Sequence, residues 1–172
     1  MSASLQMPYF IKPSLRLTRE EKIEAYEIAV AAIHANLFDA KNDILKMSTI
    51  NCILKTHLPY FYWIGFYIHR NSRLEVGPYQ GTLGCLYIDF ERGVCGKAAR
   101  TRSTQIVEDC HALIEGADHI TCDPNSQSEI VVPVINRQDE LIAVFDIDST
   151  LKNSFDAIDQ KYLEQIVQEH FN

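Results

Sequence analysis

Residues 130–147 read IVVPVINRQDELIAVFDI, and this stretch decides the class of fold. Two apolar runs rich in branched residues flank the polar segment 136–140, a pattern that predicts two strands joined by a turn. Another run, FYWIGFYI at 61–68, is rich in aromatic and branched residues and predicts a further strand. The centre of the protein is therefore expected to be a sheet.

Shorter elements separate these runs. Residues 77–84 contain three glycines and predict a loop with close backbone approaches. Residues 93–99 predict a glycine turn that leads into a short helix. Residues 108–128 are the least regular, and a loop this long inside a compact domain is usually functional or disordered. Weaker strands are expected at 74–76, 85–88 and 104–107, the first after a polar hairpin loop at 69–73.

Helix signals lie near both ends of the chain. Thr18 and Glu21 have the spacing of a capping box, and apolar residues then recur with a period close to 3.6. A second helix is expected over 43–57, and Ser154 or Asp156 can cap a C-terminal helix. Helices that flank an antiparallel sheet in this way predict an α+β domain.

The composition is that of one globular domain, expected over 18–172 after an irregular arm at 1–17. A net charge of −7 argues against partners such as nucleic acid or an anionic membrane. The longest apolar stretches are far shorter than the roughly 20 residues of a membrane-spanning helix. The first eight residues lack the layout of a signal peptide, so we expect a cytoplasmic protein.

Five cysteines supply the first candidates for chemistry. Cys122 lies in a polar loop, where a thiol is more accessible than in a helix core, and reactivity requires exposure and thiolate character. Cys85 and Cys95 each neighbour a glycine at a turn. Either one within disulfide reach of Cys122 would give a thiol redox cycle. The alternative is that both are small residues packed at tight turns.

A zinc site is a competing interpretation of the same region. Its ligands would be Cys110, His111, His119 and Cys122. This spacing fits poorly with the paired short-range ligands of structural zinc sites, and Cys110 is more typical of a packing residue.

Three acidic residues lie in or beside the apolar strands. Period-2 alternation places Asp146 and Asp148 on the same face as Val144, and Glu129 opens the strand before them. Acids on an apolar strand carry a desolvation cost, which is tolerated when they bind something or stay protonated. They either mark exposed strand ends or form a pocket for an ammonium group, with one acid neutral and able to donate a hydrogen bond.

Aromatic residues are concentrated in the run 60–67, and most of them are expected in the core. Trp63 is the single tryptophan of the chain. It could form one wall of a pocket, either by packing against a ligand or through a cation–π contact.

Six of these segments together resemble the free methionine-(R)-sulfoxide reductases, a catalytic branch of the GAF-domain fold. The similarity runs in order from about residue 18 to the C-terminus, and it includes three matching cysteines. The matching segments are YWIGFY at 62–67, GPYQG at 77–81, GVCG at 93–96, HITCD at 119–123, SQSEIVVP at 126–133 and FDIDS at 145–149.

The resemblance implies a fold and an activity. The fold would be a six-stranded antiparallel sheet with helices on one side and a loop-covered ligand pocket on the other. The activity would be reduction of free L-methionine-(R)-sulfoxide to methionine, with thioredoxin as reductant and no metal or bound organic cofactor. A homodimer and a role in oxidative stress are consistent with the same family.

The resemblance also implies residue roles. Cys122 would be the nucleophile that takes the oxygen as a sulfenic acid, and Cys85 would resolve it as a disulfide, with Cys95 as the alternative partner. The chain departs from the family pattern at 110–118, which is about three residues longer, and at Thr121, where alanine is usual. The implied substrate-binding residues are Trp63, Tyr67, Glu129, Asp146 and Asp148.

A binding protein is the alternative hypothesis. A GAF-type sensor would hold a small amino acid or a cyclic nucleotide in the same pocket without chemistry. Such a sensor has no need for a loop thiol with resolving partners, and the cysteine pattern therefore favours the enzyme.

Overall fold

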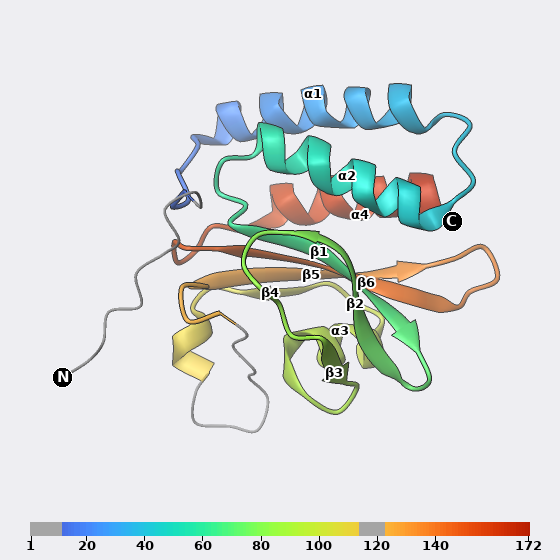
Figure 1. Ribbon diagram of the computed structural model, residues 1–172. Coiled ribbons are helices and arrows are strands. Elements are labelled where there is room, and N and C mark those ends of the chain that lie inside the picture. Colours follow the sequence, from blue (N-terminus) through green and yellow to red (C-terminus); the bar gives the residue numbers. More distant parts are fainter. Residues whose placement is uncertain (1–11, 114–122) are drawn as a thin grey trace.

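The computed structural model describes residues 12–113 and 123–172. Its strands form one antiparallel sheet in the order β3-β2-β1-β6-β5-β4, with β1 and β6 at the centre (Figure 1). The strands are β1 (Trp63–Arg70), β2 (Arg73–Gln80), β3 (Tyr87–Asp89), β4 (Gln105–Val107), β5 (Ser128–Ile135) and β6 (Leu141–Ser149).

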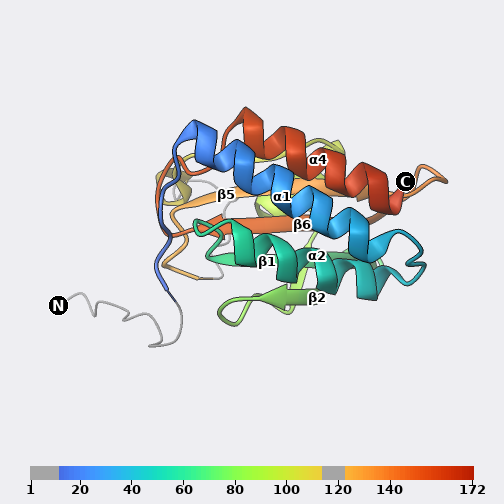
Figure 2. The same cartoon turned by 90° about the horizontal axis from the view of Figure 1, so that it is seen from above.

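The helices lie on the two faces of this sheet. Three of them cover one face, as the view from above shows (Figure 2): α1 (Arg19–Leu37), α2 (Asp43–His57) and α4 (Ala157–Phe171). On the opposite face, α3 (Gly93–Thr101) packs against β5 and β6. A short 3-10 helix follows β4 at Cys110–Leu113. The predicted α+β class is confirmed.

The predicted helix caps are present. Glu21 donates its backbone N–H to Thr18 Oγ1 at 3.2 Å, and the Thr18 backbone N–H donates to Glu21 Oε2 at 2.8 Å. Of the two candidate caps for α4, Asp156 is the one that forms a capping box, with Asp159 at the third helical position. Local polar spacing therefore located both helix starts. Within the described residues, no helix is long and apolar enough to cross a membrane.

The loop predicted at 77–84 is partly wrong, because β2 continues to Gln80. Its last residues pair with β1, and the register shifts at a bulge between Gly65 and Tyr67. A Cβ atom on Gly77 would lie 2.9 Å from the Ile68 side chain, so this glycine allows a close approach within the sheet. Strand pairing therefore outweighed the local turn signal.

Two neighbouring boundaries also differ from expectation. The predicted hairpin loop at 69–73 is a two-residue turn, because Asn71 and Ser72 both take positive φ angles (49° and 63°), a conformation that matches the twist of paired strands. The strand expected at 85–88 is Tyr87–Asp89, where it pairs with Arg73–Glu75 of β2.

The central strands have two different faces because side chains alternate along a strand. Phe66 of β1 and Phe145 of β6 point toward the helices, and their rings stack with centroids 4.1 Å apart. Each is fully buried, and burial of such a side chain contributes about 1.5–3 kcal/mol. The intervening residues of both strands face the other way and form the floor of a pocket.

A buried ionic cluster joins the helical layer to the start of β1. Asp159 of α4 is fully buried and accepts a hydrogen bond from Lys22 Nζ of α1 at 2.6 Å. Its other oxygen accepts hydrogen bonds from the hydroxyls of Tyr26, at 2.9 Å, and Tyr60, at 2.7 Å. The loss of one partner from such a pair leaves an uncompensated buried charge, which is strongly destabilising.

We expect Asp159→Ala to lower the free energy of unfolding by about 3–5 kcal/mol, because Lys22 would lose its fully buried counter-charge and keep only Asp156, whose side chain is 55% exposed. Urea unfolding followed by circular dichroism measures this change. Glu91→Ala is the control, since Glu91 is 84% exposed and 3.9 Å from Arg100, and it should change stability by less than about 1 kcal/mol. Equal effects of the two substitutions would contradict the role given to the cluster.

Candidate active site

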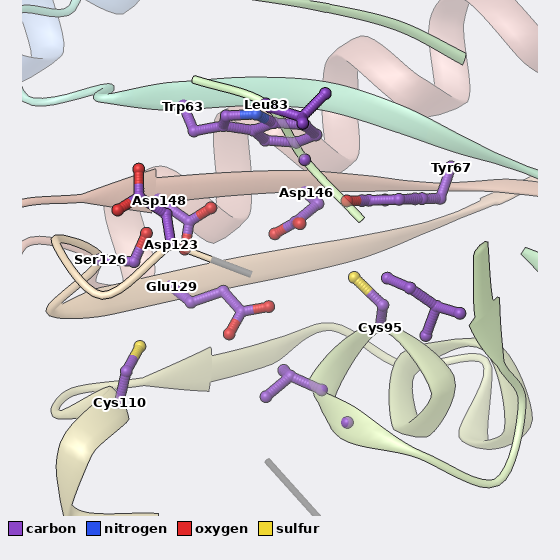
Figure 3. Close-up of a pocket in the computed structure, with 14 residues that line it drawn as sticks. Trp63, Tyr67, Leu83, Cys95, Cys110, Asp123, Ser126, Glu129, Asp146 and Asp148 are labelled. Atoms are coloured by element: carbon purple, nitrogen blue, oxygen red, sulfur yellow. The ribbon is translucent and has the colours of Figure 1, made fainter. Parts of the chain in front are cut away.

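A pocket lies between the second face of the sheet and α3 (Figure 3). Six of the predicted site residues line it: Trp63, Tyr67, Cys95, Glu129, Asp146 and Asp148. Eight further residues complete the lining: Leu83, Gly84, Ile88, Gly93, Val94, Cys110, Asp123 and Ser126.

The three predicted acids lie side by side in this pocket. Glu129 of β5 pairs with Asp148 of β6, and Asp146 is two residues further back on the same face. Glu129 is 8% exposed and Asp146 is 6% exposed, while Asp148 is half-buried. The acids therefore belong to a pocket, and the alternative of solvent-exposed strand ends is wrong.

Burial dominates the electrostatics of these acids. It raises the pKa of Asp146 to about 7. Burial, together with the charge of Asp146 and other neighbours, also raises the pKa values of Glu129 and Asp148 well above the usual range. The cluster therefore retains protons at a pH where exposed carboxyls have lost theirs.

One oxygen of the cluster is unsatisfied. Asp146 Oδ1 is buried without a hydrogen-bond partner among the described residues. Because buried polar atoms in folded proteins are nearly always paired, such an atom points to a donor supplied by a ligand.

Cys95 projects from α3 toward the acids. Ligand atoms of Cys95, Glu129 and Asp146 lie within 4.8 Å of one another, and Figure 3 shows the three side chains facing each other. Burial, followed by the negative charge of the acids, raises the pKa of the Cys95 thiol well above its usual value. Cys95 is therefore held as a neutral thiol in this arrangement. Among the described residues, these three side chains could also hold a metal ion.

The remaining cysteines have different environments. Cys85 is half-buried in the loop before β3 and is disulfide-bonded. Cys110 is a buried free thiol that lines the pocket, and Cys52 is an exposed free thiol on α2. The predicted nucleophile, Cys122, lies outside the described residues.

The alternative zinc set is only partly covered by the structure. His119, like Cys122, lies outside the described residues. His111 Nε2 is 3.0 Å from the side-chain nitrogen of Gln127, so this ring nitrogen already has a polar partner.

Trp63 forms one wall of the pocket. Its indole ring stacks with the rings of Tyr67 and Tyr79, whose centroids are 5.7 Å and 5.3 Å away, and its Nε1 donates to the Thr82 carbonyl at 3.0 Å. A Cβ atom on Gly65 would lie 2.6 Å from the indole, so glycine is required beneath the ring. The sequence thus predicted that Trp63 forms a pocket wall, but it did not predict the ring contacts and the hydrogen bond that hold the indole in place.

Other lining residues were missed. Asp123 accepts four hydrogen bonds from residues that the structure describes, and Ser126 hydrogen-bonds Asp148. The sequence signals for Asp123 are its position next to Cys122 and its place in the segment 119–123 that resembles the reductases. Ser126 begins the segment 126–133 that resembles the reductases, but the resemblance gave it no role.

Comparison with known proteins assigns the chain to a family. The GAF domain model matches residues 57–169. The free methionine-R-sulfoxide reductase of Escherichia coli is 37% identical over 124 residues, which cover 72% of this chain and 73% of that protein.

Two solved structures are similar over most of the chain. The free methionine-R-sulfoxide reductase from Neisseria meningitidis, in complex with its substrate, has a TM-score of 0.79 at 29% identity, with 92% of each chain covered. A putative GAF sensor protein from Burkholderia vietnamiensis has a TM-score of 0.79 at 35% identity, with 87% of this chain and 95% of that chain covered. The chain therefore belongs to the GAF-domain family and, within it, to the free methionine-R-sulfoxide reductases.

Proposed function

We propose that this protein reduces free L-methionine-(R)-sulfoxide to L-methionine. The observation that carries the proposal is the buried acid cluster beside an aromatic wall, in which one Asp146 oxygen has no hydrogen-bond donor among the described residues. The Escherichia coli relative is named for this activity, and the Neisseria meningitidis structure is of such an enzyme with its substrate.

The acids account for the choice of a free amino acid. A buried group of carboxyls is costly without a cation, and a substrate ammonium offsets that cost when it enters. A methionine residue within a peptide has no free ammonium, so it cannot make this interaction. Trp63 and Tyr67 supply an apolar wall for the sulfur end of the side chain.

The first chemical step uses Cys122 as the nucleophile. Its thiolate attacks the sulfoxide sulfur, while a protonated carboxyl of the cluster donates a hydrogen bond to the sulfoxide oxygen. The oxygen passes to Cys122 as a sulfenic acid, and methionine leaves. The substrate sulfur gains two electrons, which the cysteine sulfur loses.

The second step regenerates the enzyme. The Cys85 thiol attacks the sulfenic sulfur, water leaves, and a Cys85–Cys122 disulfide remains. What supports this pairing is that Cys85 is disulfide-bonded while Cys52, Cys95 and Cys110 carry free thiols. Cys95 is the alternative resolving residue. Thioredoxin supplies the dithiol that reduces the disulfide, and this recycling suits a reducing cytoplasm.

Turnover tests the proposal directly. We expect NADPH consumption in a coupled assay with thioredoxin, thioredoxin reductase and the R form of free methionine sulfoxide, and none with the S form. The similarity to a putative GAF sensor keeps a binding-only role as the alternative. Calorimetric binding of a small ligand by reduced protein that turns over neither form would favour that alternative.

Cys122→Ser should abolish turnover, because a hydroxyl cannot accept the sulfoxide oxygen as a sulfenic acid. The same coupled assay measures the loss. Cys52→Ser is the matched control, because this free thiol is exposed on α2, and it should retain full activity. Undiminished activity of Cys122→Ser would exclude Cys122 as the nucleophile.

Asp146→Asn should change how stability depends on pH. Burial raises the folded-state pKa of Asp146 to about 7, whereas an unfolded aspartate has a pKa of about 3.9. The ligand-free folded protein therefore binds more protons than the unfolded chain between these values, and its stability falls as pH rises through this window.

The variant lacks this titration, so the stability of Asp146→Asn relative to wild type should increase between about pH 5 and pH 8. Urea unfolding at several pH values measures the difference. Its KM for the sulfoxide should rise, because the substrate ammonium loses one negative partner. Parallel stability curves for the two proteins would show that Asp146 is not a perturbed acid.

A further inference from the structure

Asp123 accepts hydrogen bonds on both of its carboxylate oxygens. Oδ2 accepts from the hydroxyl of Tyr62 at 2.9 Å and from Thr82 Oγ1 at 2.5 Å. Oδ1 accepts from the backbone N–H of Asn125 at 2.8 Å and from its side-chain amide at 2.9 Å. Four donors thus hold one side chain that lines the pocket.

These contacts favour the ionised form of Asp123. Its partial burial by itself would raise the pKa, but the hydrogen bonds from Thr82, Asn125 and Tyr62 outweigh burial and lower it. Hydrogen bonds to an ionised acceptor are roughly twice as strong as those between neutral groups. Among the described residues all of these donors are neutral, so Asp123 is held without a cation that would also attract the nearby acids.

The partners of Asp123 come from segments far apart in the sequence. Tyr62 immediately precedes β1, and Thr82 lies three residues before Cys85. Thr82 also accepts the indole hydrogen bond of Trp63 through its carbonyl. Asp123 itself is covalently attached to Cys122. One carboxylate therefore connects the chain beside the nucleophile, the loop with Cys85 and the aromatic wall.

We propose that Asp123, held by Tyr62 and Thr82, is a positioning residue for the thiol chemistry of Cys122 and Cys85. The inference rests on the roles that the proposed function gives to these two cysteines. Consecutive Cα atoms are about 3.8 Å apart, so an anchor on Asp123 restrains the Cα of Cys122. A disulfide requires Cα atoms within about 7 Å, and small misplacements reduce the rate of such reactions strongly.

Two tyrosines separated by one residue give a matched pair of variants. Tyr62→Phe removes the hydroxyl that binds Asp123, whereas Tyr60→Phe removes one that binds Asp159 in the helical layer. The measurement is the equilibrium between the Cys85–Cys122 disulfide and glutathione. Its equilibrium constant gives the effective concentration of one of the two thiols at the other. The measurement requires no substrate.

We expect Tyr62→Phe to lower this effective concentration about 10-fold with little change in melting temperature. Tyr60→Phe should lower the melting temperature and leave the effective concentration unchanged. Thr82→Val should act like Tyr62→Phe, and Thr82→Ser should restore the wild-type value because it keeps the hydroxyl.

Wild-type values for both Tyr62→Phe and Thr82→Val would overturn the proposal. So would an equal loss in Tyr60→Phe, because that would reduce the effect to general destabilisation. Absence of sulfoxide turnover by the wild type would refute the proposed function alone, since the glutathione equilibrium tests the positioning role independently.

Discussion

The pairing of β1 with β6 is the constraint on which both the core and the pocket depend. Its register sets Phe66 opposite Phe145 and Gly65 opposite Asp146. Because side chains alternate, the first pair fills the helical core and the second lies under the pocket. A slip of one residue would exchange the faces, moving an acid into the core and a phenylalanine into the pocket. The same hydrophobic packing that stabilises the fold thus fixes the orientation of the site.

Two buried acids, Asp159 on the helical side of the sheet and Asp146 on the pocket side, differ in how the free-energy cost of their burial is offset. Asp159 has an ammonium and two hydroxyls as partners, so its charge is compensated within the chain. Among the described residues, one oxygen of Asp146 has no hydrogen-bond partner and its neighbours are acidic, so protonation or a ligand offsets the cost of its burial. The burial of these pocket acids lowers the stability of the ligand-free protein. It also favours ligand binding, because a ligand that pairs with the acids removes the cost of burying them. The well-satisfied helical layer offsets that cost.

Much of this architecture could be predicted from local sequence patterns. Periodicity located the long helices and central strands, and alternation put Asp146 and Asp148 on one face. The end of β2 was not predictable in this way, because pairing with β1 overrode the glycines of 77–84. The contacts of Asp123 were also out of reach, since Tyr62 and Thr82 lie 61 and 41 residues away in the sequence. Such contacts depend on which segments, far apart in the sequence, pack together in the fold, and a local sequence pattern does not predict this.

The division of labour within the pocket explains how one family can contain both reductases and a protein described as a putative sensor. The proposed ligand recognition belongs to the sheet, through the acids and Trp63, and needs no thiol. The proposed redox chemistry belongs to two loops, one with Cys85 and one with Cys122. Ligand binding can therefore persist when the sequences of those loops change. Catalysis, in contrast, requires the loops to be held in a fixed position relative to the sheet. The carboxylate of Asp123, which bonds to Tyr62 beside β1 and to Thr82 in the Cys85 loop, supplies that connection.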